Sequence, residues 1–153
     1  MDPFHRGGEF CYHWLRFIGY DFPIVILKCV GTMKVAIIGA SRDRQKYGNR
    51  AVMAYVEQGH SVFPVNPNAQ EVEGLKVYPS LTDVPDHMDR ITIYLPPEVG
   101  IGVLGEIADH GATELFLNPG SESGPLLQKA EELGLEPILA CAMLNIGQRP
   151  DRF

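Results

Sequence analysis

The stretch that decides the fold reads KVAIIGASRDRQKYG, from Lys34 to Gly48. Its first part, Lys34 to Gly39, is a short apolar run of the kind that parallel sheets bury on both faces. After the loop, Val52, Met53 and Val56 recur at helical spacing, which predicts a helix over 49–58 that ends at Gly59. The order strand, loop and helix is the opening unit of an α/β fold.

The alternation of strands and helices continues along the rest of the chain. Apolar runs predict further strands over 61–65, 90–95, 113–117 and 136–140, and helices from Pro96 to about Gly111 and over 124–133. Strands that alternate with helices imply right-handed crossovers and a parallel sheet. We therefore predict an α/β fold of the Rossmann-like type, a three-layer sandwich around a mostly parallel five-stranded sheet.

The predicted domain covers residues 33–146, with a C-terminal tail over 147–153. Residues 1–32 are rich in aromatic side chains and show no clean period. The apolar run within them, Pro23 to Val30, is shorter than the ~20 residues that cross a bilayer, and it lacks the pattern of a secretory signal. Three explanations stay open for residues 1–32: an extension that packs on the domain or on a partner, an expression tag, or a true start at Met33.

Charge and cysteine content restrict the classes of function. The net charge of −6 argues against binding to nucleic acid or to an anionic membrane. Cys11, Cys29 and Cys141 are odd in number and widely spaced, which predicts neither a metal site nor a disulfide framework. Free thiols suit a reducing compartment, so we expect a cytoplasmic protein.

Prolines and glycines gather where the predicted strands end. Four segments leave these ends: Gly39-Ala40-Ser41, Val65-Asn66-Pro67, Leu95-Pro96-Pro97 and Asn118-Pro119-Gly120. In open α/β sheets, ligands bind outside the carboxyl ends of the strands, where the strand order reverses. These segments are therefore the predicted walls of a binding site.

The first loop is suited to a phosphate group, although it matches neither common nucleotide motif. It is not GxxxxGK[ST], and it is not GxGxxG, because Ala40 and Ser41 follow Gly39. Gly39 allows a tight turn, Ser41 offers a hydroxyl, and Gly48 allows close approach where the helix begins. Four basic residues near this loop are candidates for charged hydrogen bonds to phosphate oxygens, namely Arg42, Arg44, Lys46 and Arg50.

The end of the second strand argues against NAD. An NAD-binding domain usually ends this strand with an acid that binds the ribose hydroxyl. Here the strand ends in Val65-Asn66-Pro67-Asn68, and the next acid is Glu71. A neutral asparagine tolerates a ribose that carries an extra phosphate, and Lys76 follows along the chain. The residues therefore favour a phosphorylated ribonucleotide other than NAD or P-loop ATP.

Taken in order, these segments resemble the small CoA-binding family. The matching pieces are Gly39-Ala40-Ser41, Lys46 with Gly48, Val65-Asn66-Pro67, Tyr78-Pro79-Ser80-Leu81, Pro96-Pro97 and Asn118-Pro119-Gly120. Family members resemble the N-terminal domain of the succinyl-CoA synthetase α subunit, standing alone. The resemblance covers Met33 to Leu144. It departs at Ala140, where the family often has an arginine before the cysteine.

The resemblance implies that CoA or an acyl-CoA lies across the strand ends. Its pyrophosphate would lie over Gly39, Ala40, Ser41 and Gly48, with Arg42, Arg44, Lys46 and Arg50 as partners for the phosphates. The adenosine would border Val65, Asn66 and Pro67. The pantetheine arm would border Pro96, Pro97 and Asn118.

No catalytic residue is assigned from the sequence. A synthetase α subunit carries its phosphorylated histidine in a second domain, for which this chain has no room. His60 and His110 follow predicted helices, where histidines commonly contact the last carbonyls, and Glu71 and Glu73 fall in a loop without a partner. The one reactive candidate is Cys141, which could form a mixed disulfide with CoA, although a buried apolar thiol is the simpler interpretation.

The predicted function is therefore CoA binding by a module without catalytic machinery of its own. Two alternatives stay open. One is an NAD(P)-dependent oxidoreductase, for which Tyr94, placed inside the third strand, is the nearest proton donor. The other is the CoA-binding subunit of a split acyl-CoA ligase. A homodimer or a protein partner is compatible with the small sheet.

Overall fold

The computed structural model describes residues 16–17, 20–21 and 31–153. The chain divides into two units, Met1–Thr32 and Met33–Phe153. In the first unit, β1 (Arg16–Phe17) pairs antiparallel with β2 (Tyr20–Asp21), a pair that the sequence did not predict. Cys11 and Cys29 lie outside the described residues.

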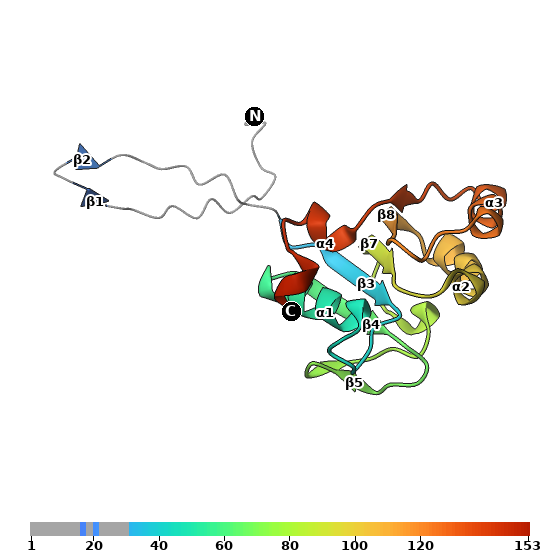
Figure 1. The fold of residues 1–153 in the computed structure, drawn as a ribbon, viewed down its shortest axis with the longest axis horizontal. Coiled ribbons are helices and arrows are strands. Elements are labelled where there is room, and N and C mark those ends of the chain that lie inside the picture. The colour runs from blue at the N-terminus through green and yellow to red at the C-terminus, as the bar shows by residue number, and fades with distance from the viewer. Residues whose placement is uncertain (1–15, 18–19, 22–30) are drawn as a thin grey trace, which may run out of the picture. The chain divides into compact units, whose positions relative to one another are not determined.

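The second unit contains a five-stranded sheet in which every neighbouring pair is parallel (Figure 1). Its strands are β3 (Lys34–Ile38), β4 (Ser61–Val65), β7 (Met88–Ile93), β8 (Ala112–Leu117) and β9 (Ile138–Leu139). They lie in the order β4-β3-β7-β8-β9. The predicted parallel five-stranded sheet is confirmed.

Two strands differ from their predicted bounds by more than one residue at an end. β7 ends at Ile93, so Tyr94 and Leu95 lie beyond it and not inside it. β9 has two residues where five were predicted. Pro137 precedes β9, and a proline has no N–H to give to a ladder, so the strand begins only after it. A short antiparallel hairpin, β5 (Glu71–Val72) with β6 (Leu75–Lys76), lies in the predicted loop after β4.

Helices cover both faces of the sheet, which confirms the three-layer sandwich. They are α1 (Tyr47–Glu57), α2 (Pro97–His110), α3 (Gly124–Glu132) and the short α4 (Ala142–Asn145). Two 3-10 turns, 81–83 and 150–152, complete the second unit. α1 begins two residues before the predicted start, and α4 was not predicted. Among the described residues, none of the helices combines the length and apolar character that a membrane crossing needs.

Side chains of β3 alternate between the two helical layers. Val35 and Ile37 pack with residues of α1 and α4, whereas Ala36 and Ile38 pack with residues of α2 and α3. All four are at most 3% exposed. Full burial of a valine or isoleucine side chain contributes about 1.5–3 kcal/mol, so the continuous apolar run stabilises both layers at once.

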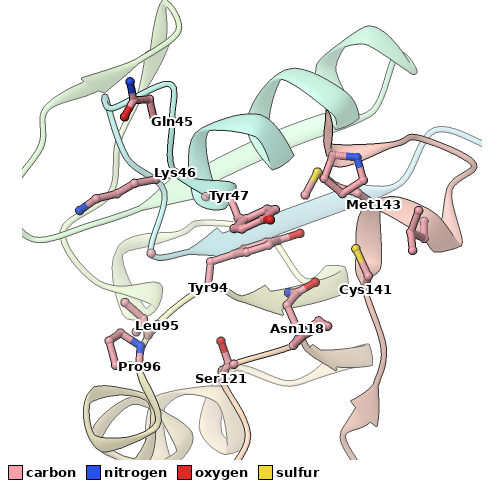
Figure 2. A pocket seen from close by; sticks show the side chains of 16 residues that line it. Gln45, Lys46, Tyr47, Tyr94, Leu95, Pro96, Asn118, Ser121, Cys141 and Met143 are labelled. Carbon is pink, nitrogen blue, oxygen red and sulfur yellow. The ribbon is translucent and has the colours of Figure 1, made fainter. Parts of the chain in front are cut away.

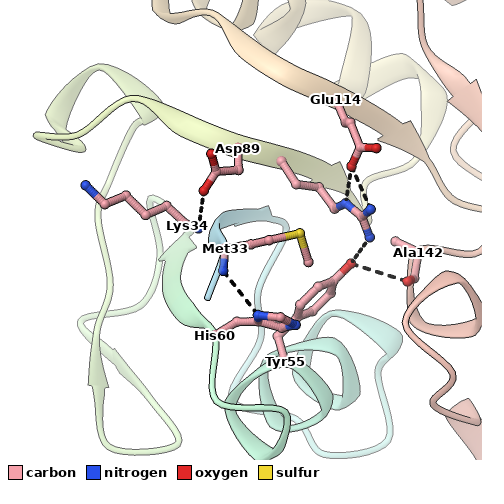
Figure 3. Close-up of polar contacts among 8 residues, drawn as sticks. Met33, Lys34, Tyr55, His60, Asp89, Glu114 and Ala142 are labelled. Atoms are coloured by element: carbon pink, nitrogen blue, oxygen red, sulfur yellow. Dashed lines mark hydrogen bonds and ion pairs between the residues drawn. The ribbon is translucent and has the colours of Figure 1, made fainter. Parts of the chain in front are cut away.

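A buried arginine joins α1 to β7, β8 and α4. Arg90 donates to Glu114 Oε2 at 2.6 and 2.8 Å and to Tyr55 Oη at 3.1 Å. Its guanidinium also lies 4.4 Å from the ring centroid of Phe116. Tyr55 in turn donates to the carbonyl of Ala142 at 3.3 Å, as Figure 3 shows. A buried charge is tolerated only when its hydrogen bonds are satisfied, and here several elements supply them.

His60 accepts a hydrogen bond at the start of β3. Its Nδ1 accepts from the N–H of Met33 at 3.3 Å, and its ring lies 5.7 Å from that of Tyr55 (Figure 3). The expected contact with the last carbonyls of the preceding helix is therefore wrong for His60. The ring of His110 lies 3.2 Å from the carbonyl of Gly111, the C-cap of α2, and 3.3 Å from the carbonyl of Val84. Burial, followed by the charge of Arg90, lowers the pKa of His60 below 6.5.

This lowered pKa predicts a loss of stability on the acid side. The unfolded chain takes up a proton near pH 6.5 while folded His60 stays neutral, so its contribution is complete above pH 6.5 and declines as the pH falls. We expect the Tm of the wild type to fall more steeply between pH 7 and 5 than that of H60Q. The exposed His87 provides the control, H87Q, which should keep the wild-type slope. Three equal slopes would contradict the prediction.

Candidate functional site

The strand order reverses between β3 and β7. The chain leaves β3 for β4 on one side and reaches β7 on the other, with α1 and α2 on opposite faces. The loops that follow these two strands diverge, and ligands of open α/β sheets bind in the crevice that results. A cavity of about 800 Å³ opens at this point, within the range usual for small-molecule sites.

Four parts of the chain line the cavity (Figure 2). The loop after β3 and the start of α1 give Gly39, Gln45, Lys46, Tyr47 and Gly48; the segment after β7 gives Tyr94, Leu95 and Pro96; the segment after β8 gives Asn118, Pro119, Gly120 and Ser121; and the C-terminal part gives Cys141, Met143, Leu144 and Pro150. Three of the four predicted strand ends therefore contribute walls.

Two glycines bring the loop and α1 into close contact. Gly39 has φ +88°, and a Cβ there would lie 2.7 Å from the carbonyl oxygen of Tyr94. A Cβ on Gly48 would overlap the carbonyl oxygen of Gly39. Both clashes are with backbone, which has no rotamer to escape into. Close approach at the helix start was the predicted reason for a glycine at position 48. In the structure, the group that approaches Gly48 is the backbone of the chain's own first loop.

The N-terminus of α1 is left without a cap. Lys46 is the N-cap residue, its side chain makes no capping bond, and the first turn has no acid. Among the described residues, the N–H groups of Tyr47 and Gly48 have no hydrogen-bond acceptor. The positive end of the helix dipole and these two donors therefore remain available for an anion.

The four basic residues of the first loop divide into two pairs. Arg44 makes a two-bond ion pair with Glu73, at 3.0 and 2.9 Å, and Arg50 donates to the carbonyl of Pro150 at 3.1 Å. Lys46 lines the cavity, and Arg42 is exposed; neither has a partner among the described residues. Of the four predicted phosphate-binding residues, two therefore remain available to a ligand, and the other two are already engaged in hydrogen bonds within the chain.

The sequence suggested that Glu73 has no partner, but in the structure this carboxylate accepts hydrogen bonds. It lies between β5 and β6 at φ +48°, where it accepts from Arg44 and, at 3.0 Å, from Nδ2 of Asn49. Hydrogen bonds from Arg44 and Asn49 lower the pKa of this carboxyl. The ion pair attaches the β5–β6 hairpin to the first loop.

The predicted adenosine border lies beside the loop but outside the cavity. Asn66 donates from Nδ2 to the carbonyl of Ala40 at 2.6 Å and accepts at Oδ1 from the N–H of Asn68 at 2.8 Å. Val65 is 5% exposed, and its carbonyl accepts from Gly39. The side chain of Asn66 therefore positions the first loop. The hydroxyl of Ser41 likewise accepts from Asp43 within its own turn.

The side chain of Asn118 links three parts of the cavity wall through hydrogen bonds. Its Nδ2 donates to Thr92 Oγ1 at 2.7 Å and to the carbonyl of Ile93 at 2.8 Å, and its Oδ1 accepts from the N–H of Ala142 at 2.9 Å. The residue is 3% exposed. Asn118 thus lines the cavity as predicted, and it also determines where α4 begins.

The structure places five of the fourteen predicted residues on the cavity: Gly39, Lys46, Gly48, Pro96 and Asn118. The other nine, namely Ala40, Ser41, Arg42, Arg44, Arg50, Val65, Asn66, Pro67 and Pro97, do not line it. The sequence did not point to six other lining residues, namely Gln45, Tyr47, Ser121, Pro150, Met143 and Leu144. The pattern that could have revealed the last two is absent, because a four-residue helix is too short to show a period.

Tyr94 was assigned to the interior of a strand and instead follows β7 into the cavity wall. Its hydroxyl is buried and has no hydrogen-bond partner among the described residues. Burial raises the pKa of this tyrosine far above its ordinary value. In the part of the chain that the structure describes, no group of three or more His, Cys, Asp or Glu side chains could hold a metal ion.

Comparison with known proteins agrees with this geometry. The model of the CoA-binding domain family matches residues 33–146, and this chain belongs to that family. The predicted resemblance is confirmed. The chain is 40% identical over 95 residues to an ADP-forming acetate–CoA ligase of Archaeoglobus fulgidus, and 36% identical over 78 residues to the α subunit of such a ligase from Pyrococcus furiosus.

These matches cover 60% and 50% of this chain but only 14% and 17% of the two ligases. The chain therefore spans a small part of the curated relatives that it matches. A solved structure of a conserved hypothetical protein from Pyrococcus furiosus is similar over nearly its whole length. It has 37% identity and a TM-score of 0.68, and the match covers 74% of this chain and 98% of that one.

Proposed function

We propose that this chain binds CoA or an acyl-CoA in the cavity between β3 and β7. The observation that supports it most is the uncapped start of α1, which opens with Lys46 onto this cavity inside a CoA-binding domain match. Free N–H groups, a helix dipole and a lysine are what a pyrophosphate needs. The family match favours CoA over the nicotinamide alternative.

The bound CoA extends along the cavity. Its pyrophosphate lies at the N–H groups of Tyr47 and Gly48, beside Lys46. The pantetheine arm runs past Leu95 and Pro96, and the adenosine lies outside the cavity, beside residues 65–67. Arg44 can bind the phosphates of the ligand only if its ion pair with Glu73 breaks.

We propose that this site binds CoA without catalytic residues of its own. Among the described residues, no His, Asp or Glu lines the cavity as a candidate general base. Ser121 donates its hydroxyl to the carbonyl of Ile93 at 3.3 Å, which makes it a poor nucleophile. On this proposal, chemistry on the bound CoA requires a partner.

A second function, the CoA-binding subunit of a split acyl-CoA ligase, is favoured by one specific observation. A similar α subunit of such a ligase exists in Pyrococcus furiosus. This proposal requires a partner that supplies the remaining domains. Co-purification of the tagged chain from its native cell would recover that partner, and a chain recovered alone would argue against this function.

Titration calorimetry of CoA into the purified chain tests the proposed site. We expect K46A to bind CoA about tenfold more weakly than the wild type, because a hydrogen bond to a charged group contributes about 1.5 kcal/mol or more. The control is K129A, whose lysine pairs with Glu132 on α3, away from the cavity, and should bind as the wild type does. Dephospho-CoA should bind more weakly than CoA. A wild type that binds neither nucleotide would exclude the proposal.

A further inference from the structure

One end of the cavity, which is formed by residues from the C-terminal part of the chain, is apolar. Cys141, Met143, Leu144 and Pro150 form this end, and none of them carries a charge. Met143 is fully buried, Cys141 is partly buried, and Leu144 is 58% exposed. The apolar end is therefore closed by Met143 on one side and open to solvent at Leu144.

Polarity changes along the cavity. Lys46 is the one charged residue among the described residues that line it. In Figure 2, Lys46 and Gln45 lie on one side of Tyr47 and Tyr94, and Cys141 and Met143 lie on the other. A ligand with an ionic group at one terminus and an apolar group at the other matches this arrangement.

The proposed function gives the ligand a direction, and this inference rests on it. With the pyrophosphate at Lys46, the pantetheine arm leads away from the phosphates, and its sulfur is the terminus that reaches the apolar end. An acyl group on that sulfur extends the ligand further into the apolar end. The buried hydroxyl of Tyr94, without a partner among the described residues, points in Figure 2 toward the side of Cys141, where a thioester carbonyl would accept from it.

We infer that the site prefers acyl-CoA thioesters with an uncharged, apolar acyl group over free CoA and over CoA esters of dicarboxylic acids. An apolar group gains by leaving water at Met143 and Leu144. A second carboxylate would lose its hydration there without a cation to replace it. Arg50 does contact Pro150, but its guanidinium is engaged by the carbonyl oxygen and does not line the cavity.

Calorimetry with three ligands that share the same nucleotide tests this preference. Full burial of a methylene improves affinity about fourfold, so in the half-open end we expect butanoyl-CoA to bind about tenfold more tightly than CoA. Succinyl-CoA should bind no more tightly than CoA. L144Q should remove most of the butanoyl preference, measured as the ratio of the two Kd values. The matched control is L139Q, because Leu139 is 55% exposed on β9 and does not line the cavity, so its ratio should equal that of the wild type.

The outcomes separate this inference from the proposed function. If CoA and butanoyl-CoA bind equally, or if succinyl-CoA binds most tightly, the acyl preference is wrong and CoA binding stands. If L139Q and L144Q change the ratio alike, the apolar end is not at Leu144. If none of the three ligands binds, the proposed function fails, and this inference fails with it.

Discussion

G48A should unfold about 3 kcal/mol more easily than the wild type, which corresponds to a Tm lower by about 6–12 °C for a chain of this size. The added methyl group would overlap the carbonyl oxygen of Gly39 and would also approach the Cα of Ala40 at 3.3 Å. Because these atoms are backbone, the loop or the start of α1 has to move. The displaced N–H groups should also cost most of the affinity for CoA, measured by calorimetry well below the Tm.

The control for this variant is G102A. Gly102 lies in the interior of α2 and is exposed, and a methyl group added there would meet no neighbouring atom within 4 Å outside its own helical turn. Alanine is the better helix former, so G102A should gain about 0.5–1 kcal/mol. Equal melting temperatures for G48A and G102A would show that the close contact at Gly48 does not constrain the fold.

N118L is expected to lose about 4 kcal/mol in the free energy of unfolding. The substitution leaves the N–H of Ala142 and the hydroxyl of Thr92 without the partner that Asn118 provides, whereas the carbonyl of Ile93 keeps its hydrogen bond from Ser121. A buried polar group without a partner costs about 1–3 kcal/mol, so two such groups account for the expected loss. Urea denaturation of the variant and the wild type measures the difference.

A second readout locates the effect of N118L. Because Asn118 holds the first N–H of α4, amide hydrogen exchange in residues 142–145 should accelerate more than in α1. The control is N145L, at an exposed position of α4, which should change stability by no more than about 0.5 kcal/mol. Uniform acceleration across both helices would mean that Asn118 acts on global stability alone.

The layout of the fold follows from residues that are close in sequence. The apolar run of β3 and the helical spacing of Val52, Met53 and Val56 are local patterns, and they predict their elements to within two residues. Gly59 and Gly111 adopt φ +81° and +75° where helices end, as glycines at such positions are expected to do. Right-handed crossovers then leave few possible arrangements for the sheet.

The part of the site that could not be predicted depends on partners far away in sequence. Arg44 and Glu73 are 29 positions apart, and their pairing removes one cation from the predicted phosphate cluster. Asn66 faces Ala40 across 26 positions, so it positions the first loop and does not line the cavity. Met143 and Leu144 of the apolar end come from α4, whose first N–H is bound by Asn118 across 24 positions. No local period encodes any of these contacts.

Backbone hydrogen bonds on both sides order the start of the first loop, where it leaves β3, in the absence of a ligand. Gly39 donates to the carbonyl of Val65 at 3.1 Å, and Tyr94 donates to the carbonyl of Ile38 at 2.8 Å. A binding surface that is already ordered requires no slow rearrangement on encounter. Rapid mixing should therefore show one association phase whose rate rises linearly with ligand concentration, and differences among ligands should arise in how slowly each one leaves.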